Sequence, residues 1–271
     1  MRLAFGSLGL EGRSRGGDRT WFRVHPPGLA FDVGRGDLAL IGVRDVFVTH
    51  GHLDHCLGLP FVLSYRARYG AGPTRVACPA AAAGALGRWL DGAAELESAR
   101  YDYEIVPMQP GDRLRVAADL EVEAFAAHHV VPSLGFHLVR ARRRLRERFR
   151  DVPGPELAAL KRGGTAIEET LVEDWVSYCG DTAATVLDAE PRLLASRILI
   201  LECTFLAAGH GDRARKFGHV HLDDLVERRD RFANEHLVLC HLSRRHSAAE
   251  LGRAVAEKLG PLAERVQLVV G

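Results

Sequence analysis

The sequence contains little lysine, few cysteines and no long apolar run. Only three of its 36 basic residues are lysine, and 35 acidic residues leave a net charge of +1, which excludes general polyanion binding through bulk charge. The five cysteines are widely spaced without a C-x-x-C pair, which predicts reduced thiols and excludes a disulfide framework. No stretch approaches the ~18 apolar residues of a membrane span, and the N-terminus lacks a signal-peptide pattern. We therefore expect a soluble cytoplasmic protein with no membrane partner.

The hydrophobic content and the sequence patterns are typical of a globular α/β protein. The hydrophobic fraction of 47% is enough for a buried core. Short runs between glycines and prolines predict strands at residues 3–7, 20–24, 29–33, 46–49, 75–77, 103–106, 113–116, 120–126, 134–139, 175–178, 197–202, 237–240 and 266–270. Helices are predicted at residues 57–69, 79–90, 222–232 and 248–259. Because no repeat or long linker divides the chain, we expect one domain over residues 1–271, with an insertion at about 138–164.

The segment 140–150 differs from the rest of the chain, because seven of its eleven residues are arginine. If it forms a helix, its few apolar residues lie on one side and most arginines point outward. Two interpretations are open. The segment is either a solvated face in an arginine-biased chain or a projection that binds RNA phosphates. The candidates for RNA contacts are Arg142, Arg143 and Arg144.

The strongest motif is Thr49-His50-Gly51-His52-Leu53-Asp54-His55, which follows an apolar strand and precedes a helix. Four side chains that can bind metal lie within six residues. His50 and His52 alternate off the strand end toward one side, whereas Asp54 and His55 start the helix and are placed to face a second ion. Imidazoles combined with a carboxylate favour zinc, with manganese or iron as alternatives.

This H-x-H-x-D-H run resembles the signature of the metallo-β-lactamase fold, which implies a four-layer αββα sandwich of two similar halves. Further pieces that resemble family motifs follow in the family's order: the turn Phe31-Asp32-Val33-Gly34, then His129, Asp181 and His241. The resemblance implies one metal held by His50, His52 and His129, and a second held by Asp54, His55 and His241, with Asp181 between them. Two such cations acidify a shared water at neutral pH. His128 is the alternative to its neighbour His129.

Several strings are similar to the tRNase Z (ribonuclease Z) branch of this fold. They are Val130-Val131-Pro132-Ser133-Leu134-Gly135-Phe136, Ile200-Leu201-Glu202-Cys203-Thr204-Phe205, Phe217-Gly218-His219 and His241-Leu242-Ser243-Arg244-Arg245. The resemblance implies that His219 is the general acid and that Glu202 orients it and keeps it charged, with His221 as the alternative acid. Asp54 acts as a ligand and as acceptor of a proton from the bridging water, and Ser243 contacts substrate.

The resulting expectation is a metal-dependent phosphodiesterase that removes 3′ trailers from precursor tRNA by attack of a metal-bridging hydroxide. The products would be a 3′-hydroxyl on the mature RNA and a 5′-phosphate on the trailer. Two alternatives are open: a hydrolase of the same fold acting on a small phosphodiester, sulfate, lactone or thioester, and a non-catalytic RNA-binding protein. Members of the branch carry an arm that grips tRNA and often form homodimers, so a homodimer is also expected from the resemblance.

Overall fold

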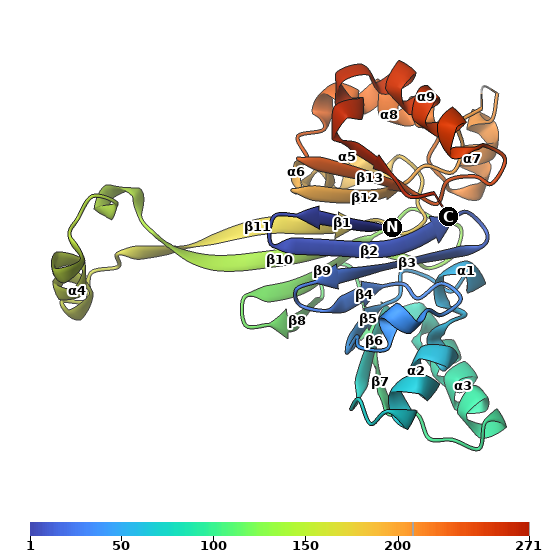
Figure 1. Cartoon of the computed structure of the whole chain (residues 1–271), viewed down its shortest axis with the longest axis horizontal. Coiled ribbons are helices and arrows are strands. Elements are labelled where there is room, and N and C mark those ends of the chain that lie inside the picture. The colour runs from blue at the N-terminus through green and yellow to red at the C-terminus, as the bar shows by residue number, and fades with distance from the viewer. Residues whose placement is uncertain (208, 271) are drawn as a thin grey trace.

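Two β-sheets packed face to face form the body of the molecule, and helices cover both outer surfaces (Figure 1). The computed structural model describes residues 1–207 and 209–270. One seven-stranded sheet contains, in spatial order, β1 (Arg2–Phe5), β2 (Leu8–Arg15), β3 (Arg19–His25), β4 (Leu29–Phe31), β5 (Asp45–Phe47), β6 (Thr74–Pro79) and β7 (Tyr103–Met108). The other contains β14 (Val266–Leu268), β13 (His236–Cys240), β12 (Ile198–Glu202), β11 (Glu168–Tyr178), β10 (Leu134–Leu145), β9 (Leu120–Ala126) and β8 (Arg113–Ala117). The predicted αββα sandwich is confirmed.

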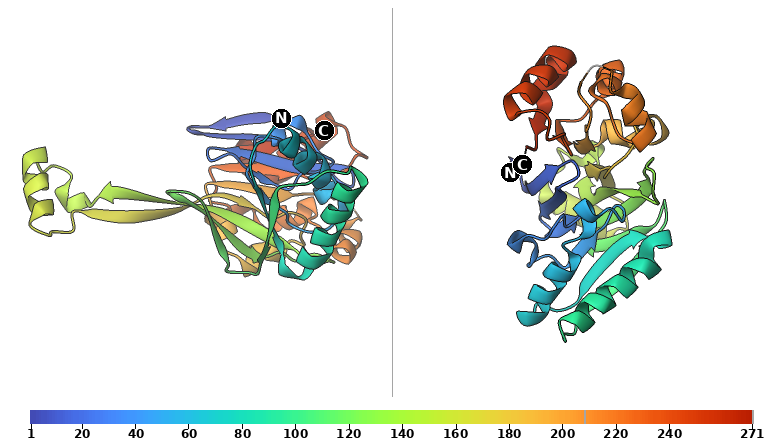
Figure 2. Two further views of the ribbon diagram at one scale, coloured as in Figure 1. Left: turned by 90° about the horizontal axis from the view of Figure 1, so that it is seen from below. Right: turned by 90° about the vertical axis from the view of Figure 1, so that its right-hand side faces the viewer.

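Each sheet joins an antiparallel half to a parallel half. The antiparallel halves are β1 to β4 and β8 to β11, and the parallel halves are β4 to β7 and β11 to β14. Parallel neighbours need crossover connections, and these supply most of the outer helices. The helices are α1 (Leu53–Cys56), α2 (Leu59–Arg68), α3 (Ala80–Leu96), α4 (Gly154–Arg162), α5 (Val186–Ala189), α6 (Arg192–Ala195), α7 (Gly211–Phe217), α8 (Leu222–Arg228) and α9 (Ala248–Leu259). The right-hand view of Figure 2 shows helices on opposite sides of the paired sheets.

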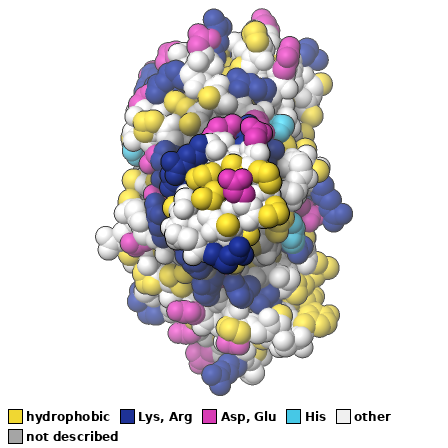
Figure 3. Space-filling view, turned by 90° about the vertical axis from the view of Figure 1, so that its left-hand side faces the viewer, with side chains coloured by type: hydrophobic (Ala, Val, Ile, Leu, Met, Phe, Trp, Pro, Cys, Tyr) yellow, Lys and Arg dark blue, Asp and Glu magenta, His cyan; other side chains and the backbone are white. Residues whose placement is uncertain are grey.

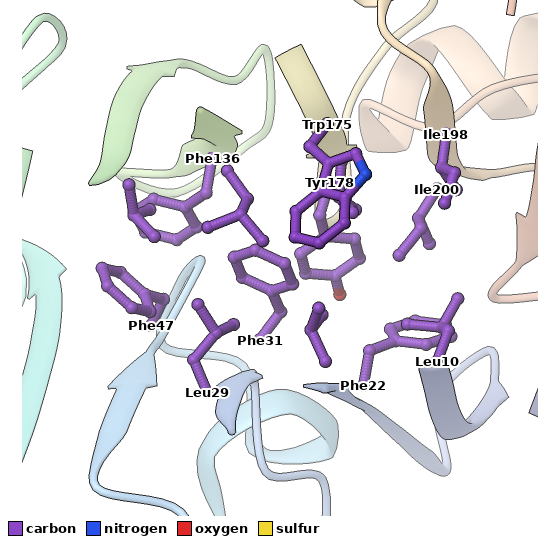
Figure 4. Close-up of a cluster of buried hydrophobic side chains, with 14 of the residues drawn as sticks. Leu10, Phe22, Leu29, Phe31, Phe47, Phe136, Trp175, Tyr178, Ile198 and Ile200 are labelled. Carbon is purple, nitrogen blue, oxygen red and sulfur yellow. The ribbon is translucent and has the colours of Figure 1, made fainter. Parts of the chain in front are cut away.

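An aromatic core lies between the two sheets (Figure 4). Phe31 from β4 stacks on Phe136 from β10 with ring centroids 6.1 Å apart, and the ring of Tyr178 from β11 lies 5.4 Å from that of Phe31. All three side chains are fully buried. Because Asp32 directly follows Phe31 and Asp181 follows Tyr178 by three residues, this packing also fixes the strand ends that carry polar side chains.

A long arm leaves the body where β10 and β11 continue beyond the rest of their sheet (Figures 1 and 2). The two strands stay paired from Phe136 opposite Tyr178 out to Leu145 opposite Glu168. A 3₁₀ turn at Glu147–Phe149 and helix α4 form the tip. Most of the insertion expected at 138–164 lies within this arm, but residues 138–140 still pair with β9 in the body, and the returning strand begins only at Glu168.

The helical interpretation of segment 140–150 is wrong. Residues 140–145 form the outer half of β10, and β11 places Glu173 opposite Arg140 and Glu169 opposite Arg144. The guanidinium of Arg142 lies 2.9 Å from the carboxylate of Glu173, and that of Arg144 lies 2.8 Å from Glu169. Cross-strand pairing of opposite charges stabilises an antiparallel hairpin. The partner strand β11 is too far from β10 in sequence for a local pattern to reveal the pairing.

Sequence patterns also missed β2 and the helices α4 to α7, and of α1 they predicted only that a helix starts at Asp54 and His55. Glycines interrupt β2, and Gly12 is required there because a Cβ would lie 2.4 Å from the ring of Phe22. Helices α1, α5 and α6 have four residues each, which is too short to show a helical period. None of the helices in the described part of the chain is long and apolar enough to cross a membrane.

Candidate metal centre

The H-x-H-x-D-H run occupies the loop that leaves β5 and enters α1, and the carboxylate of Asp32 holds this loop in place. Asp32 accepts hydrogen bonds from the backbone N–H of Thr49 at 2.8 Å and from the Thr49 hydroxyl at 2.9 Å. Since that hydroxyl proton is used, the hydroxyl oxygen accepts from Nδ1 of His50 at 2.9 Å. Nδ1 of His55 likewise donates to Asp32 at 2.8 Å. In both histidines the proton therefore sits on Nδ1, and Nε2 is left as the atom that can bind a metal.

A first group of ligand-capable side chains forms where three loops meet. His50 and His52 come from the motif loop, His129 from the loop before β10, and Asp181 from the loop after β11. One ligand atom of each lies within 4.8 Å of the others. Nδ1 of His129 donates to the carbonyl of Gly218 at 3.0 Å, which directs its Nε2 toward Nδ1 of His52, 3.3 Å away.

A second group, made of Asp54, His55 and His241, lies beside the first. Nε2 of His241 lies 3.2 Å from a carboxylate oxygen of Asp54 and 3.4 Å from one of Asp181. Nε2 of His55 lies 3.2 Å from the other oxygen of Asp181. Asp181 therefore faces both groups, as the resemblance implied. The structure brings all seven predicted ligands together, and their role as ligands stays a prediction.

Three polar atoms in these groups are buried without any hydrogen-bond partner: Nε2 of His50, Nε2 of His55 and Oδ1 of Asp181. Leaving such an atom unsatisfied costs about 1–3 kcal/mol. A pair of divalent cations would satisfy all three atoms, and imidazole nitrogens with carboxylate oxygens are ligands suited to such ions. The residues present therefore fit a site for divalent metal.

The charges of these groups also favour cations. Burial tends to raise the pKa of Asp54, but the hydrogen bond from His241 and the charges of His55 and His241 outweigh it and lower the pKa to about 2. In the same way, His241 and His55 outweigh burial and hold the pKa of Asp181 well below its ordinary value. Burial lowers the pKa of His50 well below that of a free histidine. Anionic carboxylates and a neutral imidazole are the forms that bind metal.

We expect Asp32→Asn to lower zinc affinity about 10–100-fold, because an outer carboxylate fixes the tautomer and orientation of a ligating histidine. Asn tolerates the left-handed backbone (φ 54°) found at Asp32. Competition with a chromophoric chelator measures the affinity. Tyr178→Phe is the control, since it removes a different hydrogen bond to Asp32, 2.7 Å long, and leaves the contact with His55. Unchanged affinity in a folded Asp32→Asn protein would contradict this role.

A buried Glu–His pair lies next to the two groups. Nδ1 of His219 lies 2.7 Å from Glu202 at the end of β12, and Glu202 also accepts hydrogen bonds from the backbone and hydroxyl of Thr204. Burial alone tends to lower the pKa of His219, but the charge and hydrogen bond of Glu202 outweigh it and raise the pKa to about 9. The ring of His219 is 5.2 Å from that of His129 and 5.4 Å from that of His241. A protonated imidazole is therefore available beside the candidate metal groups.

His221, the alternative acid, and His128, the alternative ligand, make hydrogen bonds outside the metal groups. Nε2 of His221 donates to the carbonyl of Ala207 at 3.0 Å, and its Nδ1 accepts from the backbone of Asp223 at 3.1 Å. Both nitrogens are thus occupied, and Nδ1 caps α8. His128 directs Nδ1 to the hydroxyl of Thr185 at 2.7 Å, away from the first group. The geometry favours His219 as the acid and His129 as the ligand candidate.

The predicted substrate-binding residues separate into two places. Ser243 lines the same hollow as His129, His219 and His241. In contrast, Arg142, Arg143 and Arg144 lie on the arm at the far end of β10.

Thr204 was quoted in a motif without a role. In the structure its hydroxyl lies 2.7 Å from Glu202 and 2.8 Å from Nδ1 of His241, so it connects the acid pair to the second group. No local pattern distinguishes such a threonine from an ordinary residue at a strand end.

Comparison with known proteins identifies the family of this chain. The model of the beta-lactamase superfamily domain matches residues 35–242. The tRNase Z TRZ1 of Arabidopsis thaliana is 29% identical over 95% of this chain and 93% of its own, and the ribonuclease Z of Thermobifida fusca is 32% identical over 85% and 79%. The crystal structure of the short form of human tRNase Z matches with a TM-score of 0.63 at 18% identity, over 96% of this chain and 95% of that one. The chain therefore belongs to the beta-lactamase superfamily and, within it, to the ribonuclease Z family of metal-dependent hydrolases.

Proposed function

We propose that this protein is the endoribonuclease that removes 3′ trailers from precursor tRNA, working with two zinc ions. The observation that carries the proposal is the Glu202–His219 pair, with 2.7 Å between carboxylate and imidazole, beside two ligand groups that share Asp181. A phosphodiester hydrolase needs such an acid because an unprotonated ribose oxygen is a poor leaving group. The family membership supports RNA as the substrate class.

Each residue has a definite task in this reaction. His50, His52 and His129 would hold one ion, and Asp54, His55 and His241 the other, with Asp181 shared. When bound, two divalent cations make water more acidic and stabilise negative charge on phosphoryl oxygens. Zinc is proposed over manganese or iron because five of the seven donors are imidazoles.

Proton transfer is the work of the chain's own side chains. Asp54, which is anionic at neutral pH, accepts the proton of the attacking water. His219 donates a proton to the departing 3′-oxygen of the mature RNA, and Glu202 keeps the imidazole oriented and charged. The trailer leaves with a 5′-phosphate.

The decisive experiment is cleavage of an end-labelled precursor tRNA by metal-loaded protein, with Asp54→Ala as control. We expect a cut just after the acceptor stem, abolished by the substitution. If the protein binds two metal ions and hydrolyses small phosphodiesters, sulfates, lactones or thioesters but not precursor tRNA, the small-molecule alternative replaces this proposal. Tight tRNA binding without any metal-dependent turnover would support the non-catalytic alternative.

The arm is the second part of the proposed RNA contact. Figure 3 looks onto its end, where dark-blue Lys and Arg side chains lie beside a hydrophobic centre. Residues 140–174 carry nine basic and seven acidic side chains, so the excess of positive charge is small. Glutamates of β11 pair with three arginines of the run, Arg142, Arg143 and Arg144, and a contact of these arginines with RNA phosphates would have to displace or share those glutamates.

We expect the triple change Arg142→Ala, Arg143→Ala and Arg144→Ala to raise KM for precursor tRNA about tenfold or more, because each lost phosphate contact weakens binding. The slope of log KM against log salt should fall by about one for each lost contact. The matched opposite change is Glu169→Gln with Glu173→Gln, which releases Arg144 and Arg142 from their ion pairs. This variant should bind RNA more tightly at low salt. Equal KM values for all three proteins would leave the arm without a role in RNA binding.

A homodimer is proposed on the position of the arm. The loop before β10 carries His129, and β10 then runs for 12 residues, about 40 Å, with its outer half in the arm. In Figure 1 the arm and α4 lie at the left, whereas α1 and α7, beside the site, lie at the right. The arm therefore points away from the metal centre of its own chain, and we propose that it serves a partner subunit.

Mixing two inactive variants tests this arrangement. One lacks the arm and keeps an intact centre, and the other keeps the arm and carries Asp54→Ala. If the arm acts on the partner's centre, the mixed protein should regain cleavage, up to half of the wild-type activity for each mixed dimer. Mixtures that stay inactive although light scattering shows dimers would assign the arm to its own subunit.

The predicted cytoplasmic location rests on the five free, buried cysteines, which suit a reducing compartment.

A further inference from the structure

A second hollow opens beside the metal centre, and we refer to it as the cationic hollow. It has a volume of about 160 Å³ and is lined by Thr204, Phe205, Leu206, His210, Arg213, Ser243, Arg245 and His246. Four of these residues also line the hollow of about 300 Å³ that contains His52, His129, His219 and His241. The shared residues are Thr204, Phe205, Arg213 and Ser243. The two hollows therefore adjoin each other, and the cationic hollow lies between the hollow of the ligand groups and the basic side chains of Arg245, His210 and His246.

The arginines of the cationic hollow have no acidic partner, unlike Arg142, Arg143 and Arg144 of the arm. Within residues 1–207 and 209–270, no carboxylate lies within 4.0 Å of Arg213 or Arg245, and no Asp or Glu lines the hollow. By contrast, Arg215 on the same helix as Arg213 is paired with Asp212. Two unpaired guanidinium groups next to a site for an anionic substrate are typical of phosphate binding.

An aromatic ring lies beside the candidate acid and lines the same hollow as Arg213. Phe205 is partly exposed, and its ring lies 6.0 Å from that of His219 and 6.1 Å from that of His210. Backbone hydrogen bonds from Phe205 to Val220 at 3.2 Å and from Leu222 to Phe205 at 2.8 Å fix the segment. A rigid, partly exposed ring beside unpaired arginines is the arrangement that stacks a nucleobase while its phosphate is held.

We propose that the cationic hollow binds the nucleotide whose 3′-oxygen leaves, with its base against Phe205 and its 5′-phosphate on Arg213 and Arg245. This inference rests on the proposed function, because it assumes that His219 protonates the departing 3′-oxygen. The nucleotide that carries this oxygen must lie beside His219, and Phe205 is the aromatic side chain there that faces the hollow. The hollow thereby holds the last nucleotide of the mature RNA next to the cut. A substrate with no nucleotide on that side of the scissile phosphate leaves the hollow empty.

The test compares precursor tRNA with bis(p-nitrophenyl) phosphate, a small phosphodiester that has no nucleotide to fill the hollow. For Arg213→Ala with Arg245→Ala, the ratio of the two kcat/KM values should fall at least about tenfold, and the salt slope for precursor tRNA should fall by about one. Phe205→Ala should lower the same ratio about fivefold or more, since stacking of one base is lost, and Phe205→Trp should restore it. Arg244→Ala is the matched control, because Arg244 is equally charged and exposed but does not line the hollow.

The outcomes separate this inference from the proposed function. A ratio that is the same in the double-arginine variant and in Arg244→Ala overturns the inference while cleavage of precursor tRNA stands. If the wild-type protein does not cleave precursor tRNA, the proposed function fails, and the hollow is then tested without catalysis by anisotropy of a fluorescent trinucleotide RNA. Binding weakened tenfold by Arg213→Ala with Arg245→Ala, but not by Arg244→Ala, supports a nucleotide site. Equal binding by the two variants overturns it.

Discussion

Replacing Asp181 with alanine should lower kcat for precursor tRNA by more than about 10³-fold, which corresponds to several kcal/mol of lost charge stabilisation. Asp181 is the side chain that both ligand groups share: it belongs to the group of His50, and its other oxygen lies 3.2 Å from His55. Without it, imidazoles of the two groups would face one another with no anion between them. We therefore expect loss of metal as well as loss of rate.

The measurement combines single-turnover cleavage with metal content determined by mass spectrometry. Wild-type protein should hold two metal ions per chain, and Asp181→Ala should hold fewer. Asp230→Ala serves as control because its carboxylate is exposed and paired only loosely with Arg229, at 3.8 Å. A variant of Asp181 that keeps two ions and cleaves at the wild-type rate would remove this residue from the centre.

The sequence was informative wherever neighbouring residues act together. His50, His52, Asp54 and His55 lie within one loop, so their spacing alone predicted a metal site. The partners His129, Asp181 and His241 come from strand ends far apart in sequence and could be assigned only by resemblance. Packing of the two sheets brings those ends together, and no local pattern contains that information.

Atomic detail decided what spacing left open. The sequence favoured His219 as the acid and left His221 as an alternative, and only the structure shows that both nitrogens of His221 are occupied, Nδ1 in capping α8 and Nε2 in a hydrogen bond to the carbonyl of Ala207. The pattern of charges in the sequence likewise did not show which arginines have acidic partners. The run at 140–150 was conspicuous, yet three of its arginines (Arg142, Arg143 and Arg144) are paired with glutamates of β11, whereas the isolated Arg213 and Arg245 have no acidic partners among the described residues.

Replacing His219 with alanine should lower kcat about 10²–10⁴-fold, the range expected for loss of a positioned general acid. The distinguishing test uses a precursor whose scissile 3′-oxygen is replaced by sulfur, because a thiolate leaves without being protonated. His219→Ala should cleave this substrate nearly as fast as the wild-type protein does. If the defect persists on the sulfur substrate, His219 has a structural role or binds metal instead.

Glu202→Gln tests the same acid through its pKa. Glu202 raises the pKa of His219 to about 9, so the proton is present at neutral pH and is lost only as pH rises past that value. Without the carboxylate the pKa falls, and the alkaline limb of the kcat profile should move to lower pH. The loss of rate relative to the wild-type protein should then be greater at pH ~8 than at pH ~6. His221→Asn, which retains a side chain able to cap α8, should leave the profile unchanged. A Glu202→Gln profile that superimposes on the wild-type profile would show that another group supplies the proton.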